Sequence, residues 1–343
     1  MPERLDPPPL PEGGRRPVDV VAVGHALVDR LAEVPTEQVA ASGMELGAMT
    51  LVDGEAAAAI ERSVGAWQEA AGGSAANTAA GVASLGGTAA FAGSVGDDEA
   101  GRRYVADLEA AGVLCVAVPA GSGEPTGVSH VLVTPGGERS MATSLAAAAA
   151  VSPAAVEGAG VERASVVYLE GYLLDAPSAR QALERAVELA RRSGTLVALS
   201  LSDRFVVERH RSAIAGMVQA GEVDVLFGNE EETLALTGER DLPHALGALG
   251  TGATSGMLVY VTRGPRGSVA ARGAERAEVP PEPVRQVVDT TGAGDLFAAG
   301  VLFGLTNGHD AVEAARIGSL AAAEVIGHLG ARPHVRLSGL LGG

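Results

Sequence analysis

Short apolar runs alternate with longer amphipathic stretches along most of the chain. Val18–Gly24 is rich in valine and ends in glycine, which predicts a first strand. From residue 164 onward the alternation is regular, with predicted strands SVVYLEG, TLVALSL, VDVLFGN, MLVYVT and GSVAAR and predicted helices over Ser178–Arg192, Val206–Val218, Asp295–Leu305 and Ala311–Leu329. This order predicts an α/β fold with a Rossmann-like, mostly parallel sheet and helices on both faces.

The pattern changes between residues 113 and 142, where three short segments predict extended strands. They are Val113–Val118, Gly127–Thr134 and Glu138–Ala142, and Pro135-Gly136-Gly137 predicts a hairpin turn between the last two. Met44–Val52 is a further, more isolated extended segment. Together these pieces predict a small sheet, built from about 44–52 and 113–142, apart from the main one.

The first 17 residues contain prolines and charges without an apolar run, which predicts a loose tail and no signal peptide. A single cysteine, Cys115, excludes an internal disulfide framework and favours a reducing compartment. No apolar run is long enough to cross a bilayer. We therefore expect a cytoplasmic protein in which residues 18–335 form one large domain.

The charged residues exclude several classes of function. A net charge of −17 argues against nucleic acid or an anionic membrane as a partner. All 25 basic residues are arginine, and the lack of lysine excludes a Walker A loop, a Schiff-base enzyme and the strand lysine of protein kinases. If this protein handles phosphate, backbone amides, arginine and a metal ion must supply the countercharge.

The segment DTTGAGD, Asp289 to Asp295, places a polar loop directly before an apolar predicted helix. Unpaired amides and the helix dipole at such a terminus favour an anion. The ordinary interpretation is that Asp295 caps the helix and the glycines permit a tight turn. The alternative is phosphoryl transfer, in which the amides stabilise the transferring group and the carboxylate takes a proton from the attacking hydroxyl.

Other polar segments follow predicted strands or open predicted helices, and each has two interpretations. Gly72–Asn77 is a closely packed helix start or a site where Asn77 binds hydroxyls. Asp29 is a surface acid or the partner of two neighbouring sugar hydroxyls. The acidic residues of Asn229–Glu232 are ordinary partners of a helix dipole. Alternatively, they bind the magnesium ion of a nucleotide through water molecules. Thr262–Gly267 is a turn or a contact for a phosphate tail. The histidines lack metal-ligand spacing, so a zinc site is not expected.

Taken in chain order, the loops described above resemble those of one family, the ribokinase-like (PfkB) carbohydrate and nucleoside kinases. The resemblance extends from about Val18 to Pro333. DTTGAGD is the most specific match. GGSAANTAAGVASLGG at Gly72–Gly87, continued by GSVGDDEAG, is similar to the N-terminal signature of the family. Asn229 and Glu232 stand at the places of its N-x-x-E motif.

The resemblance implies a ribokinase-like kinase domain over 18–335 with a small β-sheet lid, and phosphorylation of a primary hydroxyl with ATP and Mg²⁺. It implies Asp295 as the base, with Gly292, Ala293 and Gly294 as the anion hole. The implied acceptor-binding residues are Asp29, Gly73, Asn77, Glu170 and His25, and the implied ATP-binding residues are Asn229, Thr262, Gly264 and Gly267. Glu232 is implied to hold Mg²⁺ through water, and Asp289 and Thr291 a monovalent cation such as K⁺.

The segments YLEGYLLD, LSLSDRF and GHLGARP are most similar to bacterial adenosine kinase-like members, which predicts a nucleoside such as adenosine as the acceptor. A sugar kinase of ribose or fructose type is the alternative. His25, where relatives commonly have asparagine, and the region around Ala142 are expected to line the acceptor pocket. Lids of this family often pair, so a homodimer through the lid is expected.

Two other classes compete with the kinase. A nicotinamide-dependent oxidoreductase would share the α/β pattern, but the first turn, GHALVD, lacks the glycine fingerprint of a dinucleotide site. A non-catalytic nucleoside-binding module would keep Asp29 and Asn77 and lose the base, whereas Asp295 is present.

Overall fold

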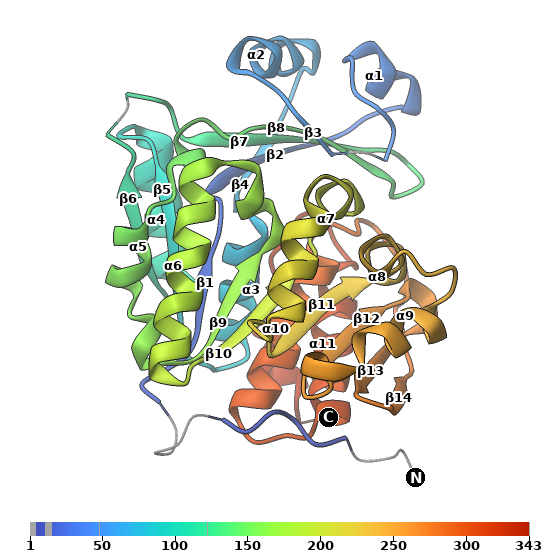
Figure 1. Cartoon of the computed structure of the whole chain (residues 1–343). Coiled ribbons are helices and arrows are strands. Elements are labelled where there is room, and N and C mark those ends of the chain that lie inside the picture. The colour runs from blue at the N-terminus through green and yellow to red at the C-terminus, as the bar shows by residue number, and fades with distance from the viewer. Residues whose placement is uncertain (1–4, 11–15, 48, 122, 343) are drawn as a thin grey trace.

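A nine-stranded sheet forms the centre of the computed structural model, which describes residues 5–10, 16–47, 49–121 and 123–342 (Figure 1). Its order is β14-β13-β12-β11-β10-β9-β1-β5-β6, and only the pairs β12–β13 and β13–β14 are antiparallel within these residues. The strands are β1 (Val18–Val23), β5 (Ala89–Val95), β6 (Val113–Pro119), β9 (Ala164–Glu170), β10 (Leu196–Ser200), β11 (Val225–Asn229), β12 (Leu258–Thr262), β13 (Ser268–Arg272) and β14 (Glu275–Val279). The predicted Rossmann-like, mostly parallel sheet is confirmed.

Both faces of this sheet are apolar, because successive side chains of a strand point to opposite sides. Val20 and Ala22 of β1 face one apolar core, and Val21 and Val23 face the other. The first core includes side chains of α3 (Ser74–Ser84), α4 (Glu99–Ala110), α10 (Ala293–Thr306) and α11 (Ala311–Val325). The second includes side chains of α5 (Pro153–Ala159), α6 (Pro177–Ser193), α7 (Arg204–Gln219), α8 (Glu230–Thr237) and α9 (Leu242–Leu249).

A second, small sheet lies over one end of the large one (Figure 1). Its order is β3 (Met49–Leu51), β8 (Arg139–Ser144), β7 (Gly127–Val133), β2 (Leu27–Glu33) and β4 (Gln68–Gly72). Two helices, α1 (Thr36–Ala41) and α2 (Gly54–Ser63), cover its outer face through an apolar core that includes Val39, Ile60 and Leu132. The predicted small sheet is therefore confirmed, while a homodimer through it stays a prediction.

The composition of the small sheet differs from the prediction in three ways. Val113–Pro119 is the edge strand β6 of the large sheet, where Val113 is 2% exposed and Leu114 is 55% exposed. The run VLCVAV is apolar throughout, so the sequence pattern does not distinguish an edge strand of the large sheet from a strand of the small one. Strands β2 and β4 were not predicted, and β4, QEAAG, has no β-branched residue. The hairpin turn at 135–137 is confirmed, and residue 48 of the predicted segment 44–52 lies outside the described residues.

The predicted loose tail is wrong at Leu5. This side chain is 2% exposed, and its carbonyl oxygen accepts a hydrogen bond from the Ala311 amide at 2.9 Å. Arg272 Nη1 donates to the Asp6 carbonyl oxygen at 3.0 Å. Residues 1–4 and 11–15 of the predicted tail lie outside the described residues. The segment 5–10 is thus attached to the last long helix, at the end of the molecule away from the small sheet (Figure 1).

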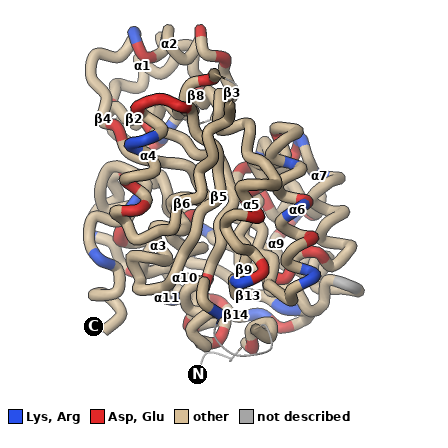
Figure 2. The backbone as a smooth tube through the Cα atoms, turned by 90° about the vertical axis from the view of Figure 1, so that its left-hand side faces the viewer, with Lys and Arg blue, Asp and Glu red and all other residues tan. Residues whose placement is uncertain are grey.

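The charged residues lie mainly on helices and loops, as Figure 2 shows, whereas β5 and β6 carry none. In the described part of the chain, no helix is both long enough and apolar enough to span a membrane.

Candidate active site

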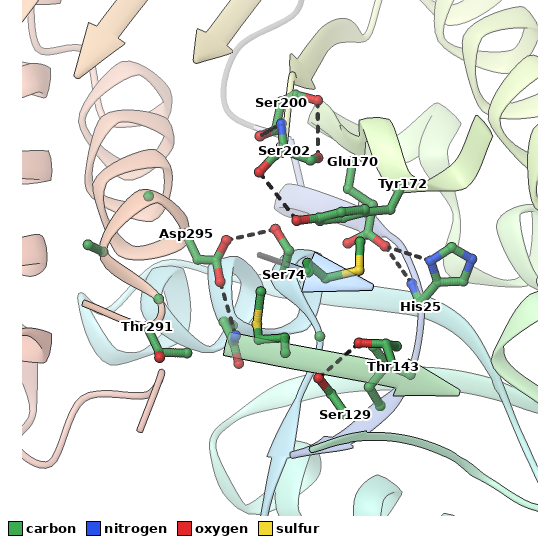
Figure 3. A pocket seen from close by; sticks show the side chains of 18 of the residues that line it. His25, Ser74, Ser129, Thr143, Glu170, Tyr172, Ser200, Ser202, Thr291 and Asp295 are labelled. Carbon is green, nitrogen blue, oxygen red and sulfur yellow. Dashed lines mark hydrogen bonds and ion pairs between the residues drawn. The ribbon is translucent and has the colours of Figure 1, made fainter. Parts of the chain in front are cut away.

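A cavity of about 300 Å³ lies between the small sheet and the carboxyl ends of the parallel strands (Figure 3). Ligands of open α/β sheets bind at this edge. The cavity is lined by thirteen of the sixteen predicted site residues: His25, Asp29, Gly73, Asn77, Glu170, Asn229, Glu232, Thr262, Thr291, Gly292, Ala293, Gly294 and Asp295. Asp289, Gly264 and Gly267 are not among the lining residues.

Asp295 lies in the first turn of α10 and is held by α3. Its Oδ1 accepts a hydrogen bond from Ser74 Oγ at 2.7 Å, and its Oδ2 accepts one from Asn77 Nδ2 at 3.0 Å (Figure 3). Burial raises the pKa of this carboxyl, and the two hydrogen bonds act in the opposite direction. Since α3 holds both of its oxygens, Asp295 does not act as a simple cap of its own helix.

Close packing of two helices brings these groups together. A Cβ atom on Gly81 of α3 would lie 2.6 Å from the Ala299 Cβ of α10 and 2.7 Å from a methyl group of Leu296. Only a residue without a side chain permits this approach. The sequence SAANTAAGVAS, made of small residues, therefore allows the starts of α3 and α10 to meet.

The turn before α10 leaves the approach to the helix N-terminus open. Gly292 has φ of +80°, and a Cβ atom there would lie 2.6 Å from the Ala331 carbonyl oxygen. A Cβ atom on Gly294 would meet no atom within 4 Å. The Ala293 amide donates to the Thr290 carbonyl oxygen at 3.2 Å, so it is already engaged in the turn. Of the predicted anion hole, Gly292 and Gly294 are the better candidates to bind phosphate.

The acceptor side of the cavity contains the buried carboxyl of Asp29. Asp29 is 8% exposed and packs against Gly72, where a Cβ atom would lie 2.1 Å from the carboxyl carbon. Burial raises the pKa of Asp29 to about 7, against the lowering effect of the Arg332 charge. Gly73 has φ of +90°, and a Cβ atom there would lie 2.2 Å from the His25 carbonyl oxygen. Glycine at both positions allows the β1–β2 connection to contact the start of α3.

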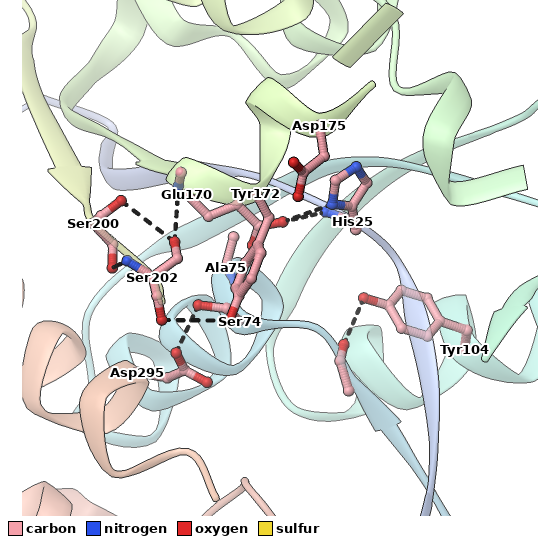
Figure 4. A network of polar contacts seen from close by, with 12 residues as sticks. His25, Ser74, Ala75, Tyr104, Glu170, Tyr172, Asp175, Ser200, Ser202 and Asp295 are labelled. Carbon is pink, nitrogen blue, oxygen red and sulfur yellow. Dashed lines mark hydrogen bonds and ion pairs between the residues drawn. The ribbon is translucent and has the colours of Figure 1, made fainter. Parts of the chain in front are cut away.

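Glu170 joins two loops of the site (Figure 4). Its Oε1 accepts a hydrogen bond from the His25 amide at 2.8 Å and lies 3.2 Å from His25 Nδ1. Its Oε2 accepts a hydrogen bond from the Ala75 amide at 2.9 Å. The side chain is 1% exposed. These contacts indicate a positioning role and leave little of the carboxylate for the direct sugar contact that the resemblance implied. The His25 Nε2 atom is buried and has no hydrogen-bond partner among the described residues.

Asn229 and Glu232 form a capping box at the start of α8. Glu232 Oε2 accepts from the Asn229 amide at 2.9 Å, and Asn229 Oδ1 accepts from the Glu232 amide at 2.8 Å. Burial raises the pKa of Glu232 to about 7. The ordinary interpretation of this motif as a helix start is therefore correct, and both residues also line the cavity.

Three predicted residues hold the loops around the cavity together. Gly267 has φ of +78°, and its Cβ would lie 2.1 Å from the Val279 carbonyl oxygen, so this glycine serves the turn before β13. Gly264, also outside the cavity lining, opens the same turn. Asp289 is fully buried, and its Oδ1 accepts from the Thr291 amide at 2.8 Å and the Thr291 hydroxyl at 2.6 Å. Its role in cation binding stays a prediction.

Arg139, the first residue of β8, was not among the predicted site residues. It lines the cavity, and its Nη1 donates to the Thr290 carbonyl oxygen at 3.3 Å, across from the small sheet to the loop before α10. In a chain without lysine, an arginine two residues after the predicted hairpin turn was the available signal. Its charge favours the ionised forms of Asp295 and Asp29.

The region around Ala142 lines the cavity as expected, but Ala142 itself does not. Ala142 is 1% exposed and packs into the outer core of the small sheet, under α1 and α2. Its neighbours Met141 and Thr143 line the cavity instead, because adjacent residues of a strand face opposite sides. Thr143 and Ser129 share a buried hydrogen bond of 3.0 Å on this inner face (Figure 3).

Comparison with known proteins agrees with this geometry. Residues 47–336 match the family described as pfkB family carbohydrate kinase. The crystal structure of adenosine kinase from Sinorhizobium meliloti is similar at a TM-score of 0.90 and 43% identity, over 94% of this chain and 98% of that one. A probable sugar kinase from Rhizobium etli CFN 42 has a TM-score of 0.91 and 38% identity, over 95% and 98%.

A similar relative by sequence is the adenosine kinase of Saccharomyces cerevisiae. It is 29% identical over 330 residues, which cover 91% of this chain and 95% of the relative. The chain therefore belongs to the PfkB family of carbohydrate kinases and is an ATP-dependent phosphotransferase that acts on a hydroxyl group of a sugar or nucleoside.

Proposed function

We propose that the protein transfers the γ-phosphoryl group of ATP to a primary hydroxyl of a nucleoside such as adenosine. The observation that carries the chemistry is the carboxylate of Asp295, held by Ser74 and Asn77 at the open N-terminus of α10. The similarity to an adenosine kinase at 43% identity supports the choice of acceptor.

The lining of the small sheet favours a nucleoside over a free sugar. Leu27, Met49 and Met141 present apolar side chains to the cavity. Thioether sulfur packs favourably against aromatic rings, and a nucleobase buries apolar surface that a free sugar lacks. A ribose or fructose would leave this part of the wall without a matching partner, so the sugar kinase is the second candidate.

The chain's own residues account for the transfer step. Asp29 and Asn77 would bind hydroxyls of the acceptor, and Asp295 would take the proton of its primary hydroxyl. The freed oxygen forms a bond to the γ-phosphorus of ATP while the bond to the bridging oxygen breaks, and ADP leaves. The amides of Gly292 and Gly294, with Arg139 from the small sheet, would stabilise the charge on the transferring group.

The nucleotide side offers oxygen ligands suited to magnesium-bound water. Both carboxylate oxygens of Glu232 accept hydrogen bonds from Asn229, at 2.9 and 2.7 Å. Their remaining lone pairs suit hydrogen bonds from the water molecules that Mg²⁺ usually retains. They are less suited to direct coordination of the ion. We propose that Glu232 holds Mg²⁺ in this way, and that the ion neutralises phosphate charge. Asp289 and Thr291 are the proposed site for a monovalent cation. Thr262, which lines the cavity at the end of β12, is a proposed contact for the nucleotide.

Glu232→Gln is expected to raise the Mg²⁺ concentration needed for half-maximal rate. Glutamine preserves a capping box, so the start of α8 should remain folded while the negative charge is lost. A Mg²⁺ titration at saturating ATP and acceptor measures the effect. Glu231→Gln, an exposed neighbour in the same turn, is the control and should leave the titration unchanged. A Glu232→Gln titration identical to that of the native protein would remove Glu232 from this role.

An assay of ADP formation with a panel of acceptors tests the proposed function. Adenosine is expected to give the highest kcat/KM, above other nucleosides and well above ribose and fructose. Higher kcat/KM for a sugar would establish the alternative kinase. Binding of nucleosides without ADP formation would indicate a non-catalytic module.

His25→Asn is expected to change the ranking of acceptors while leaving the KM for ATP unchanged. The buried Nε2 atom of His25 lacks a partner, and loss or gain of one such buried hydrogen bond changes binding by ~1–3 kcal/mol. His130→Asn is the control. His130 is also buried, at 1% exposed, but its ring packs against Trp67 and does not line the cavity. Equal losses for every acceptor, or a loss confined to ATP, would show that His25 does not face the acceptor.

A further inference from the structure

The segment after α11 contacts three parts of the site. The Gly330 amide donates to Asp289 Oδ2 at 2.9 Å, and Ala331 packs directly against Gly292. Arg332 Nε donates to Asn77 Oδ1 at 3.4 Å. Residues 330–332 therefore support the loop before α10 on one side and the acceptor-binding start of α3 on the other.

Arg332 is a charged group in unusual surroundings. Its Nη2 atom is buried and, among the described residues, has no hydrogen-bond partner. Burial lowers the pKa of this guanidinium, and the titratable groups that face it are Tyr104, Asp29, Asp107 and Cys115. Arg332 does not line the cavity. Arg332 as a whole is half-buried, but its guanidinium contacts Asn77 and its charge acts on Asp29, two interactions that an apolar side chain could not make.

The Asn77 amide can satisfy its neighbours in only one orientation. Its Nδ2 donates to Asp295 Oδ2 at 3.0 Å, and its Oδ1 accepts from Arg332. A flipped amide would place its oxygen against the carboxylate of Asp295 and its two N–H donors against Arg332, which has donors only. Asp295 and Arg332 therefore favour the same orientation, in which Asn77 supports Asp295.

The charge of Arg332 also acts on Asp29. Burial raises the pKa of Asp29 to about 7, and Arg332 is the strongest influence in the opposite direction, followed by Asp295, which raises it, and Arg139, which lowers it. Asp289 adds a smaller raising effect. Without Arg332 the pKa of Asp29 would rise further, and less of it would be ionised at neutral pH.

We propose that Arg332 is a positioning residue for phosphoryl transfer. It orients Asn77 against Asp295, and it keeps Asp29 ionised so that this carboxylate accepts hydrogen bonds from hydroxyls of the substrate. It acts through these two side chains and does not touch the reacting atoms. This inference rests on the proposed roles of Asp29, Asn77 and Asp295.

The test compares Arg332→Gln and Arg332→Lys with the native protein, using adenosine or whichever acceptor of the panel is phosphorylated best. Arg332→Gln is expected to raise the acceptor KM and lower kcat, by ~10-fold or more in kcat/KM, with the KM for ATP unchanged. Arg332→Lys keeps the charge, so it should recover part of the loss and provides a second variant if the glutamine protein does not fold.

The pH profile separates positioning from simple loss of stability. In the native protein kcat/KM for the acceptor should fall below pH about 7, as Asp29 takes up a proton. In Arg332→Gln this limb should move to higher pH, and in Arg332→Lys it should stay in place. Arg16→Gln is the control for stability, because Arg16 donates to four groups, Glu162, Ala164, Ser193 and Thr195, away from the cavity.

Unchanged acceptor kinetics and an unmoved pH limb in Arg332→Gln would overturn the proposal. Equal losses for ATP and acceptor, together with a fall in melting temperature like that of Arg16→Gln, would reduce Arg332 to a structural residue and also overturn it. Asp29→Asn and Asn77→Ala identify the other failure. If these two leave the acceptor KM unchanged, the proposed function of the pocket residues is wrong, whatever Arg332 does.

Discussion

Asp295→Asn is expected to lower kcat by ~10²–10⁴ while leaving the fold and the binding of ATP intact. Asparagine has nearly the same shape as aspartate but cannot take the proton of the acceptor hydroxyl. Burial raises the pKa of Asp295, so its ionised form is disfavoured in the folded protein above the pKa of the unfolded chain. The neutral substitution should therefore keep or slightly raise the melting temperature. Single-turnover kinetics and a thermal melt measure the two effects.

Asp310→Asn is the matched control for a helix cap. Asp310 Oδ1 accepts from the amides of Val312 and Glu313 at 3.0 Å each, at the start of the next helix, α11. Asparagine caps a helix about as well as aspartate, so this substitution should leave both stability and kcat near the native values. Near-native turnover in Asp295→Asn would assign Asp295 to a structural role and contradict the proposed mechanism.

Arg139→Gln is expected to have the second largest effect, a loss of ~10²–10³ in kcat. This arginine reaches from β8 of the small sheet to the Thr290 carbonyl oxygen, next to the proposed anion hole. Because the chain has no lysine, the cavity depends on this guanidinium, backbone amides and metal for positive charge. Arg139→Lys should recover only part of the rate, since an ammonium group lacks the planar set of donors that binds phosphate.

The control for Arg139 is Arg30→Gln, in β2 of the same sheet. Arg30 pairs with Glu69 at 2.9 Å and also with Glu61, and does not line the cavity. The Arg30→Gln variant should therefore have the same kcat as the native protein. A kcat for Arg139→Gln within a few-fold of the native value would show that charge at the phosphate comes from α10 and Mg²⁺ alone.

The parts of the site encoded in short segments could be predicted from the sequence. Asp289 to Asp295 contains the glycine that adopts φ of +80° and the first residues of the apolar helix α10, so the conformation of this turn depends largely on neighbouring residues. The same is true of the capping box between Asn229 and Glu232. In such segments the residues that interact lie within one helical turn of each other.

The errors arose where a structure depends on distant residues. Whether Ala142 or its neighbours face the cavity depends on which side of the small sheet α1 and α2 cover, and a shift of one residue exchanges the two faces. The contact between Arg332 and Asn77 joins residues 255 positions apart. No local pattern marks such a pair, which is brought together by the packing of α11 against α10 and of α10 against α3.

The order of the helices on one face of the large sheet has a consequence for synthesis on the ribosome. Helices α10 and α11, which follow residue 292, complete the core that α3 and the strands begin some 200 residues earlier. At ~5–20 residues per second, translation of the intervening segment leaves that apolar face uncovered for ten seconds or more. The nascent chain is thus most prone to aggregate just before Asp295, the proposed base, emerges, and a chaperone that binds apolar surface should engage it in that interval.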